Sequence, residues 1–215
     1  SRGLGDVYKR QMYQRYATYI FRVVKAKMGN YLIFFPSYRF MEDVYQEFTQ
    51  LLASDEEEME LVIQQKHMDE EERENFLRAF EMGREKSLIG FGVLGGIFSE
   101  GIDLTNEKLI GTLIIGTGLP QVCNEREILK SYFDQKGLYG FDYAYRYPGM
   151  NKVLQAAGRV IRTEDDRGVI LLLDERFQRE KGKEIFPKEW ADCERCRLDI
   201  VEEKIRLFWE KQTDN

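Results

Sequence analysis

Short apolar runs alternate with amphipathic stretches along most of the chain. Spacings of three and four residues between apolar positions indicate helices, and short continuous apolar runs indicate buried strands. Because the strands are almost entirely apolar and helices separate most of them, the pattern predicts an α/β fold with a mainly parallel sheet and helices on both faces. In chain order we expect helix 12–28, strand 31–35, helix 37–52, strand 60–65, helix 69–83, strands 87–94 and 109–116, helix 125–135, strand 169–173 and helix 199–211.

Two segments do not follow this pattern. Residues 1–11 have no hydrophobic period, and we interpret them as a non-native leader outside the fold. Residues 137–149 are rich in tyrosine and glycine, also without a clear period, and are expected to form an ordered loop or a short insertion. Because no repeat, low-complexity tract or long linker interrupts the rest, we expect one domain over residues 12–215.

Composition describes an ordinary globular protein, with 43% hydrophobic and 33% charged residues. No apolar run approaches the roughly 20 residues that span a bilayer, so we expect no membrane contact. The net charge of −6 and pI of about 5.1 limit any nucleic-acid contact to a local groove. The three cysteines, an odd number without a secretory signal, suggest a cytoplasmic protein. Cys193 and Cys196 have the spacing of half a zinc site but lack a second pair, so free thiols are expected and no metal site.

The segment 153–162 would place two arginines and an amide on one side of a helix. At 3.6 residues per turn, Gln155, Arg159 and Arg162 fall on one stripe. Gly158, in the middle of this helix, costs about 1 kcal/mol relative to alanine, which indicates a close approach there. Two guanidiniums one turn apart suit phosphate oxygens, although the stripe could also be an ordinary solvated face. The opposite side is expected to pack into the core through Val153, Leu154, Ala157, Val160 and Ile161.

Three segments carry a resemblance to a known family. Gln155-Ala-Ala-Gly-Arg-Val-Ile-Arg162 resembles motif VI of superfamily 2 helicases. Its continuation through Leu173-Asp-Glu-Arg-Phe177 resembles more narrowly the XPD/DinG branch. Gly95-Gly-Ile-Phe-Ser-Glu-Gly-Ile-Asp103 is similar to motif V of that branch, and Phe34-Phe-Pro-Ser-Tyr38 to its motif IV. The motifs stand in the family's order and cover the chain from about residue 31 to residue 190.

The resemblance implies a RecA-like fold of the P-loop NTPase type and a set of nucleotide contacts. Motif VI of the family supplies arginines to ATP held between two such domains, so Arg159 and Arg162 would be catalytic, and Gln155 would also contact ATP. Gly101 and Asp103 follow a predicted strand, where ligands of open α/β sheets bind. Gly101 would let the backbone approach ATP, and Asp103 could accept hydrogen bonds from ribose or hold an arginine. A tight turn with an Asx cap would explain these two residues equally well.

The resemblance also implies contacts with single-stranded DNA. Ser37 and Tyr38 follow a strand in the segment that faces DNA in the family, where serine can bond phosphate and tyrosine can stack on a base. Ser99 and Glu100 belong to motif V, which links the nucleotide to the nucleic-acid backbone. For Ser37 and Tyr38, a helix cap and a packed aromatic ring remain the structural alternatives.

Several family features are missing from this sequence. It has no Gly-x-x-x-x-Gly-Lys-Ser/Thr loop for the triphosphate, no acidic box for Mg²⁺, and no four cysteines for an iron–sulfur cluster. In the family these belong to the first motor domain. The chain therefore resembles the second motor domain alone, with half of an ATP site and no ATPase activity by itself. Its partners would be single-stranded DNA and an N-terminal motor domain of the same polypeptide.

The implied full-length protein is an ATP-dependent DNA helicase of DNA repair type, which uses ATP with Mg²⁺ and moves 5′→3′. An iron–sulfur cluster could occur in the missing part. A DinG-like protein with a nuclease domain elsewhere is a related alternative. A helicase-like module that binds nucleic acid or protein without catalysis is an alternative of another class, and a phosphate-binding loop upstream would exclude it.

Overall fold

The computed structural model describes residues 2–55, 58–80, 85–98, 109–161, 166–179 and 183–211. In chain order the elements are α1 (Arg2–Ala26), β1 (Asn30–Phe35), α2 (Tyr38–Ala53), β2 (Met59–Ile63), α3 (Glu70–Arg78), β3 (Ser87–Val93), β4 (Leu109–Ile115), α4 (Asn124–Gln135), the π-helix η1 (Asp142–Arg146), α5 (Tyr147–Ala157), β5 (Val169–Leu173), the 3₁₀ turns η2 (Glu175–Gln178) and η3 (Lys188–Trp190), and α7 (Val201–Glu210). Each predicted strand lies within a few residues of its expected bounds, and each predicted helix is present, although α1 begins ten residues earlier than expected and α5 is displaced toward the N-terminus.

The five strands form one parallel sheet in the order β2-β3-β1-β4-β5. β1 lies at its centre, and every residue of β1 after Asn30 is buried. Buried apolar positions on both sides of a strand are expected when helices cover both faces of a parallel sheet. The predicted fold class, α/β with a parallel sheet, is confirmed.

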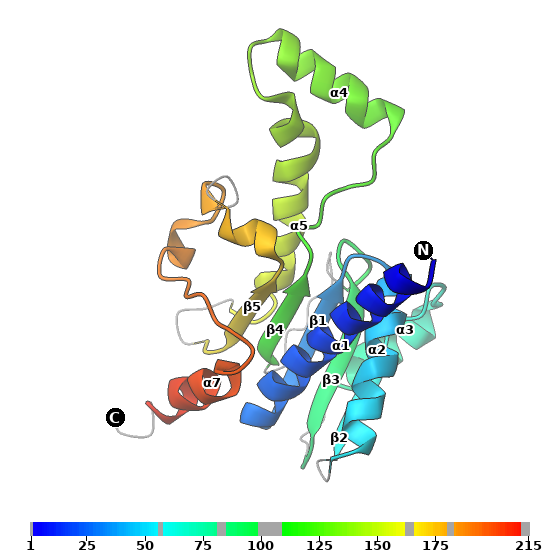
Figure 1. Ribbon diagram of the computed structural model, residues 1–215, viewed down its shortest axis with the longest axis vertical. Coiled ribbons are helices and arrows are strands. Elements are labelled where there is room, and N and C mark those ends of the chain that lie inside the picture. Colours follow the sequence, from blue (N-terminus) through cyan, green and yellow to red (C-terminus); the bar gives the residue numbers. More distant parts are fainter. Residues whose placement is uncertain are drawn as a thin grey trace.

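Helices cover the two faces unequally (Figure 1). On one face α1, α2 and α7 pack on alternate strand side chains such as Tyr31 and Ile33. The other face carries α3 and α5, which pack on the intervening side chains such as Leu32 and Phe34. This alternation is the period of two that a strand imposes on its side chains. A hydrophobic core therefore lies on each face of the sheet. The helices cover the faces and not the strand ends.

The segment predicted as a loop, 137–149, is largely helical, so that prediction is wrong. It contains η1 and the first turn of α5, and with α4 it forms an arm that projects from the sheet in Figure 1. Its aromatic rings pack on one another: Phe133 stacks on Tyr143 with 4.1 Å between centroids, and Phe141 on Tyr145 with 5.2 Å. Tyr139, Tyr143 and Tyr147 recur every four residues. That period is close to a wide helical turn, and its regular spacing is the signal that the sequence reading missed.

The first residues also differ from expectation. Residues 2–11, interpreted as a leader without regular structure, continue α1 as its first turns. The side chains of residues 5–10 are exposed, although Arg10 Nε donates to Glu47 Oε1 of α2 over 3.1 Å. Their origin outside the native protein stays a prediction. None of the described helices, including the 25-residue α1, is long and apolar enough to cross a membrane.

Candidate functional site

Ser37 and Tyr38 lie at the carboxyl end of β1, where α2 begins. Ser37 has extended backbone angles and is the N-cap of α2, because its Oγ accepts a hydrogen bond from the Phe40 N–H over 3.3 Å. Tyr38 is half-buried, and its hydroxyl accepts a hydrogen bond from Gln64 Nε2 over 2.8 Å. Both structural alternatives, a cap and a packed ring, are therefore present. Ser37 itself is exposed, so its hydroxyl still faces solvent at this edge.

Gln64 is a buried polar side chain that joins three strand ends at this edge. Its exposed fraction is 2%, and it follows β2 directly. While Nε2 donates to Tyr38, Oε1 accepts from the Val93 N–H of β3 over 2.9 Å. The Gln64 backbone N–H also donates to the Phe91 carbonyl over 2.8 Å. Because a buried amide left unbonded costs about 1–3 kcal/mol, these partners fix the position of Tyr38 relative to the start of motif V. Sequence reasoning missed Gln64, which looked like the last polar residue of a strand.

The segment that resembles motif V begins in the described part of the chain and continues outside it. Gly95 has a φ of +74°, and a Cβ there would lie 2.9 Å from Lys152 Cδ of α5. The positive φ favours glycine at this position, and the absence of a side chain also lets Lys152 lie close to the backbone. Four predicted site residues lie outside the described residues, namely Ser99, Glu100, Gly101 and Asp103.

The helix that carries motif VI ends earlier than expected. α5 stops at Ala157, and Gly158 is its C-cap, with a φ of −65°. Gly158 therefore does not interrupt a helix, and its suggested role in a close mid-helix contact is wrong. A glycine and the loss of intrahelical bonding together favour termination at this position. Arg162 lies outside the described residues.

The prediction that Gln155 and Arg159 lie on one stripe of a single helix is therefore wrong. Gln155 is exposed on the last turn of α5, and half-buried Arg159 lies in the turn beyond the cap, where its N–H donates to the Ala156 carbonyl over 3.3 Å. Gln155 and Arg159 are thus four residues apart but not on one continuous helix. Of the residues expected in the core, Val153, Ala157 and Val160 are buried, Leu154 is half-buried, and Ile161 is 39% exposed.

The predicted contact residues that the structure describes lie at opposite edges of the sheet, with Ser37 and Tyr38 at one edge and Arg159 at the other. α5 runs against the strand direction. Its first turn lies beside Gly118, beyond the end of β4, as the close approach of the two backbones shows: a Cβ on Gly118 would lie 2.6 Å from the Gly149 carbonyl oxygen. After α5 ends, a Cβ on Gly168 would lie 3.0 Å from the carbonyl oxygen of Ile110, at the start of β4. Eleven helical residues span about 16 Å. Arg159 is therefore at the amino edge, whereas Tyr38 is at the carboxyl edge.

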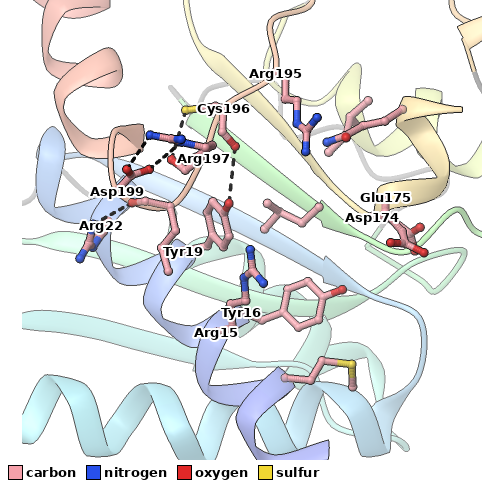
Figure 2. A pocket seen from close by; sticks show the side chains of 15 residues that line it. Arg15, Tyr16, Tyr19, Arg22, Asp174, Glu175, Arg195, Cys196, Arg197 and Asp199 are labelled. Carbon is pink, nitrogen blue, oxygen red and sulfur yellow. Dashed lines mark hydrogen bonds and ion pairs between the residues drawn. The ribbon is translucent and has the colours of Figure 1, made fainter. Parts of the chain in front are cut away.

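A large cavity beside the sheet contains none of the predicted site residues. It has a volume of about 860 Å³ and lies between α1, the end of β5 and residues 195–199 (Figure 2). At the end of β5, Asp174 caps η2 and pairs with Arg176 through two hydrogen bonds of 2.9 and 2.6 Å. Burial alone would raise the pKa of the Asp174 carboxyl, but the bonds and charge of Arg176 outweigh it, and the pKa is lowered. The Arg176 guanidinium holds its charge correspondingly more firmly, with a raised pKa.

The two neighbouring thiols lie in the C-terminal segment. Cys193 is exposed, and burial raises the pKa of the half-buried Cys196. Among the residues that the structure describes, no three histidine, cysteine or carboxylate side chains gather as metal ligands would.

Comparison with known proteins gives a consistent result. The family model of the helicase C-terminal domain matches residues 20–193. The chain is 28% identical over 180 residues to the XPD/RAD3 helicase subunit of general transcription and DNA repair factor IIH from Saccharomyces cerevisiae, which covers 79% of the chain and 22% of that protein. It is 27% identical over 179 residues to the ATP-dependent DNA helicase XPD of Sulfolobus acidocaldarius, covering 80% of the chain and 30% of the relative.

A solved structure of an XPD helicase superposes with a TM-score of 0.61 at 22% identity, over 81% of this chain and 30% of that one. This likeness supports the fold. The chain spans less than a third of the length of these relatives. Because the family model covers most of the chain, the chain belongs to the helicase C-terminal domain family, and it is similar to the XPD-like members of that family.

Proposed function

We propose that this chain is the second motor domain of an ATP-dependent DNA helicase. The observation that carries the proposal is the order of motifs IV, V and VI on a parallel sheet within a chain of the helicase C-terminal domain family. An N-terminal motor domain of the same polypeptide would hold the triphosphate and Mg²⁺. This domain would complete the site from the other side of a cleft.

In this proposal Arg159 and Arg162 act on the γ-phosphate and Gln155 orients the nucleotide. Arginine forks bind phosphate oxygens through paired hydrogen bonds and stabilise the charge that develops during phosphoryl transfer. These residues would supply only one side of an ATP site. Gln155 is exposed and Arg159 half-buried beside it, but the sequence lacks a phosphate-binding loop. Gly101 and Asp103 of motif V would add backbone and carboxylate contacts to the nucleotide.

We further propose that the carboxyl edge binds single-stranded DNA through Ser37, Tyr38, Ser99 and Glu100. The half-buried ring of Tyr38, held through Gln64, is a fixed surface on which a base can stack. Closure on ATP and opening after hydrolysis would change the distance between two DNA contacts and move the protein along one strand. Movement in the 5′→3′ direction is carried over from the family resemblance.

Two measurements on the isolated 215-residue chain test this proposal. It should show no steady ATP turnover, and its single-strand DNA affinity should fall steeply with salt, because a local groove on an acidic protein binds mainly through phosphate contacts. ATP turnover that is insensitive to Arg159→Ala would overturn the half-site. Tight, salt-independent DNA binding would overturn the assignment of the groove. An upstream sequence without a phosphate-binding loop would favour the non-catalytic module.

A further inference from the structure

β5 is an edge strand made only of apolar residues, each of them half-buried. Its sequence is Val-Ile-Leu-Leu-Leu, and all five residues are half-buried, whereas nearly all residues of β1, β3 and β4 are buried. It pairs with β4 in regular register without a bulge. Natural edge strands are commonly protected by lysine, proline or a bulge, which prevent pairing with another strand. β5 has none of these three features, and in the described residues no further strand pairs with its outer side. Residues 183–196 stand beside it across a cavity rather than in a strand ladder with it.

Two cavities run along this open edge. The cavity of about 860 Å³ and a second of about 500 Å³ share seven lining residues: Tyr19, Leu172, Leu173, Asp174, Gln178, Arg195 and Cys196. They therefore form one groove, which we call the β5 groove. Neighbouring strands lie about 4.8 Å apart, so an extended segment entering the groove could hydrogen-bond to the outer side of β5.

The two walls of the β5 groove differ in chemistry. On the face of the sheet that packs on α1, the cavity is lined by Arg15, Tyr16 and Tyr19 of α1 and by residues 195–199. The second cavity is lined by the aromatic side chains Phe177, Phe186 and Trp190, which pack on the other face through Ile170 and Leu172. Its rim also carries charged side chains, namely Lys183, Lys188, Glu194 and Arg195. Successive side chains of an added strand would point to these two walls in turn.

Most charged groups of the first wall have partners. Arg22 donates to the Leu198 carbonyl over 2.7 Å, and Arg197 pairs with Asp199 at 2.8 Å. The acidic side chains are neutralised too, since Asp174 pairs with Arg176 and Glu175 with Arg179.

Two exposed arginines differ from this pattern. In the described part of the chain, Arg15 and Arg195 make no ion pair, and Figure 2 shows their guanidiniums directed into the cavity from opposite sides. The charge left without a partner in the groove is therefore positive.

We propose that the β5 groove binds an extended segment of another protein by adding it as a strand to the open edge of β5, with acidic side chains toward Arg15 and Arg195 and apolar side chains toward Phe186 and Trp190. The backbone ladder supplies affinity, and the alternation of acidic and apolar residues supplies specificity. The inference concerns a different surface from the proposed ATP and DNA contacts, and it does not depend on motor activity.

The probe is a labelled peptide of about ten residues that alternates glutamate and valine, with blocked ends. Its binding to the 215-residue chain is followed by fluorescence anisotropy. Wild type should bind saturably, and the double variant Arg15→Glu/Arg195→Glu should bind at least about tenfold more weakly. Arg78→Glu, an exposed arginine on α3 near the opposite edge of the sheet, is the matched control and should bind as wild type.

Two modified peptides test the mode of binding on the unaltered protein, so that the result does not depend on a variant that folds. The peptide with glutamine in place of glutamate should lose the charge-dependent part of its affinity. The peptide methylated on alternate backbone nitrogens should not bind, because it cannot form the ladder. Bound acidic peptide should slow hydrogen exchange of the outward amides of β5.

The proposal is overturned if the acidic peptide does not bind, or if its affinity is unchanged by charge reversal in the protein and by backbone methylation. It is also overturned if light scattering shows a dimer that the double variant dissociates, because a second copy would then fill the groove.

Discussion

The two edges of the sheet hold their proposed site residues in different ways. At the carboxyl edge, Ser37 caps α2, and Tyr38 and Gln64 are joined by a hydrogen bond in a largely buried network. At the amino edge, Gln155 is exposed and Arg159 lies in the turn after α5. At the carboxyl edge, the residues proposed to bind DNA also stabilise the fold. At the amino edge, the proposed ATP contacts can be removed while α5 and its buried face stay in place. Substitutions at the amino edge should therefore change activity more than stability, and substitutions at the carboxyl edge should change both.

The largest expected effect is at the amino edge. In the full-length enzyme, Arg159→Ala and Arg162→Ala should each lower the ATP hydrolysis rate by about 10³–10⁵, the range for an arginine that stabilises phosphoryl transfer. Thermal midpoints should stay within about 4 °C of wild type, because the buried face of α5 is untouched. Lysine should restore little activity, since it lacks the planar fork. Gln155→Ala should be milder. Normal hydrolysis by the arginine variants, or their unfolding, would make these residues structural.

The next largest effect is the loss of the network at the carboxyl edge. Gln64→Leu leaves the Val93 N–H without its partner inside the protein and should lower the free energy of unfolding by about 1–3 kcal/mol. Tyr38→Phe removes only the hydroxyl and should cost about 1 kcal/mol. Urea unfolding of both variants and the double variant measures their coupling. Additive effects would show that the Tyr38–Gln64 bond contributes nothing to stability.

A smaller effect is expected at the cap of α2. Ser37→Ala removes the acceptor for the Phe40 N–H and should destabilise the chain by about 1 kcal/mol, whereas Ser37→Asp should retain most of the stability. The two variants differ in charge, so DNA affinity provides a second measurement. If Ser37 contacts phosphate, the aspartate variant should keep its stability and still bind single-stranded DNA more weakly than wild type. Equal DNA affinity for both would remove Ser37 from the DNA contact.

The smallest expected effect is the contribution of Asp174 to the pH dependence of the free energy of unfolding. The folded pKa of Asp174 is lowered below its ordinary value of 3.8, so its contribution is complete above that pH and is lost as the pH falls through the lowered value. Asp174→Asn should make unfolding free energy less sensitive to acid below about pH 4. Glu175→Gln, at an exposed neighbouring carboxylate, is the control and should retain the wild-type profile. An unchanged acid profile in Asp174→Asn would mean that other carboxylates dominate.

The sequence predicts the sheet well, because each strand has its own apolar run and the helices their own period. It does not predict the arm, where α4 has no buried residue and ring-on-ring packing such as Phe133 on Tyr143 joins it to η1. It also extends α5 too far, because the residues beyond Gly158 keep a helical apolar spacing even though the helix ends there.

Among the proposed site residues, Ser37 is identified as a cap from sequence, since serine before an apolar run is a local signal. Gln64 is missed because its importance comes from contacts with Tyr38 and Val93, which are distant in sequence. The separation of Tyr38 and Arg159 onto opposite edges likewise follows from the direction of α5 against the strands, which no single motif contains.

The central claim is that Tyr38 at the carboxyl edge binds DNA while Arg159 at the amino edge acts on ATP, and one paired measurement tests it most directly. Single-strand DNA affinity and DNA-independent ATP hydrolysis are measured on full-length Tyr38→Leu and Arg159→Ala, with Tyr38→Phe as the control that keeps the ring. Tyr38→Leu should weaken DNA binding by about tenfold or more, the contribution of one stacked base, and leave hydrolysis unchanged. Arg159→Ala should lose hydrolysis and keep its DNA affinity. If Tyr38→Leu binds DNA as wild type does, or if both variants lose both activities in proportion, the two-edge account is wrong.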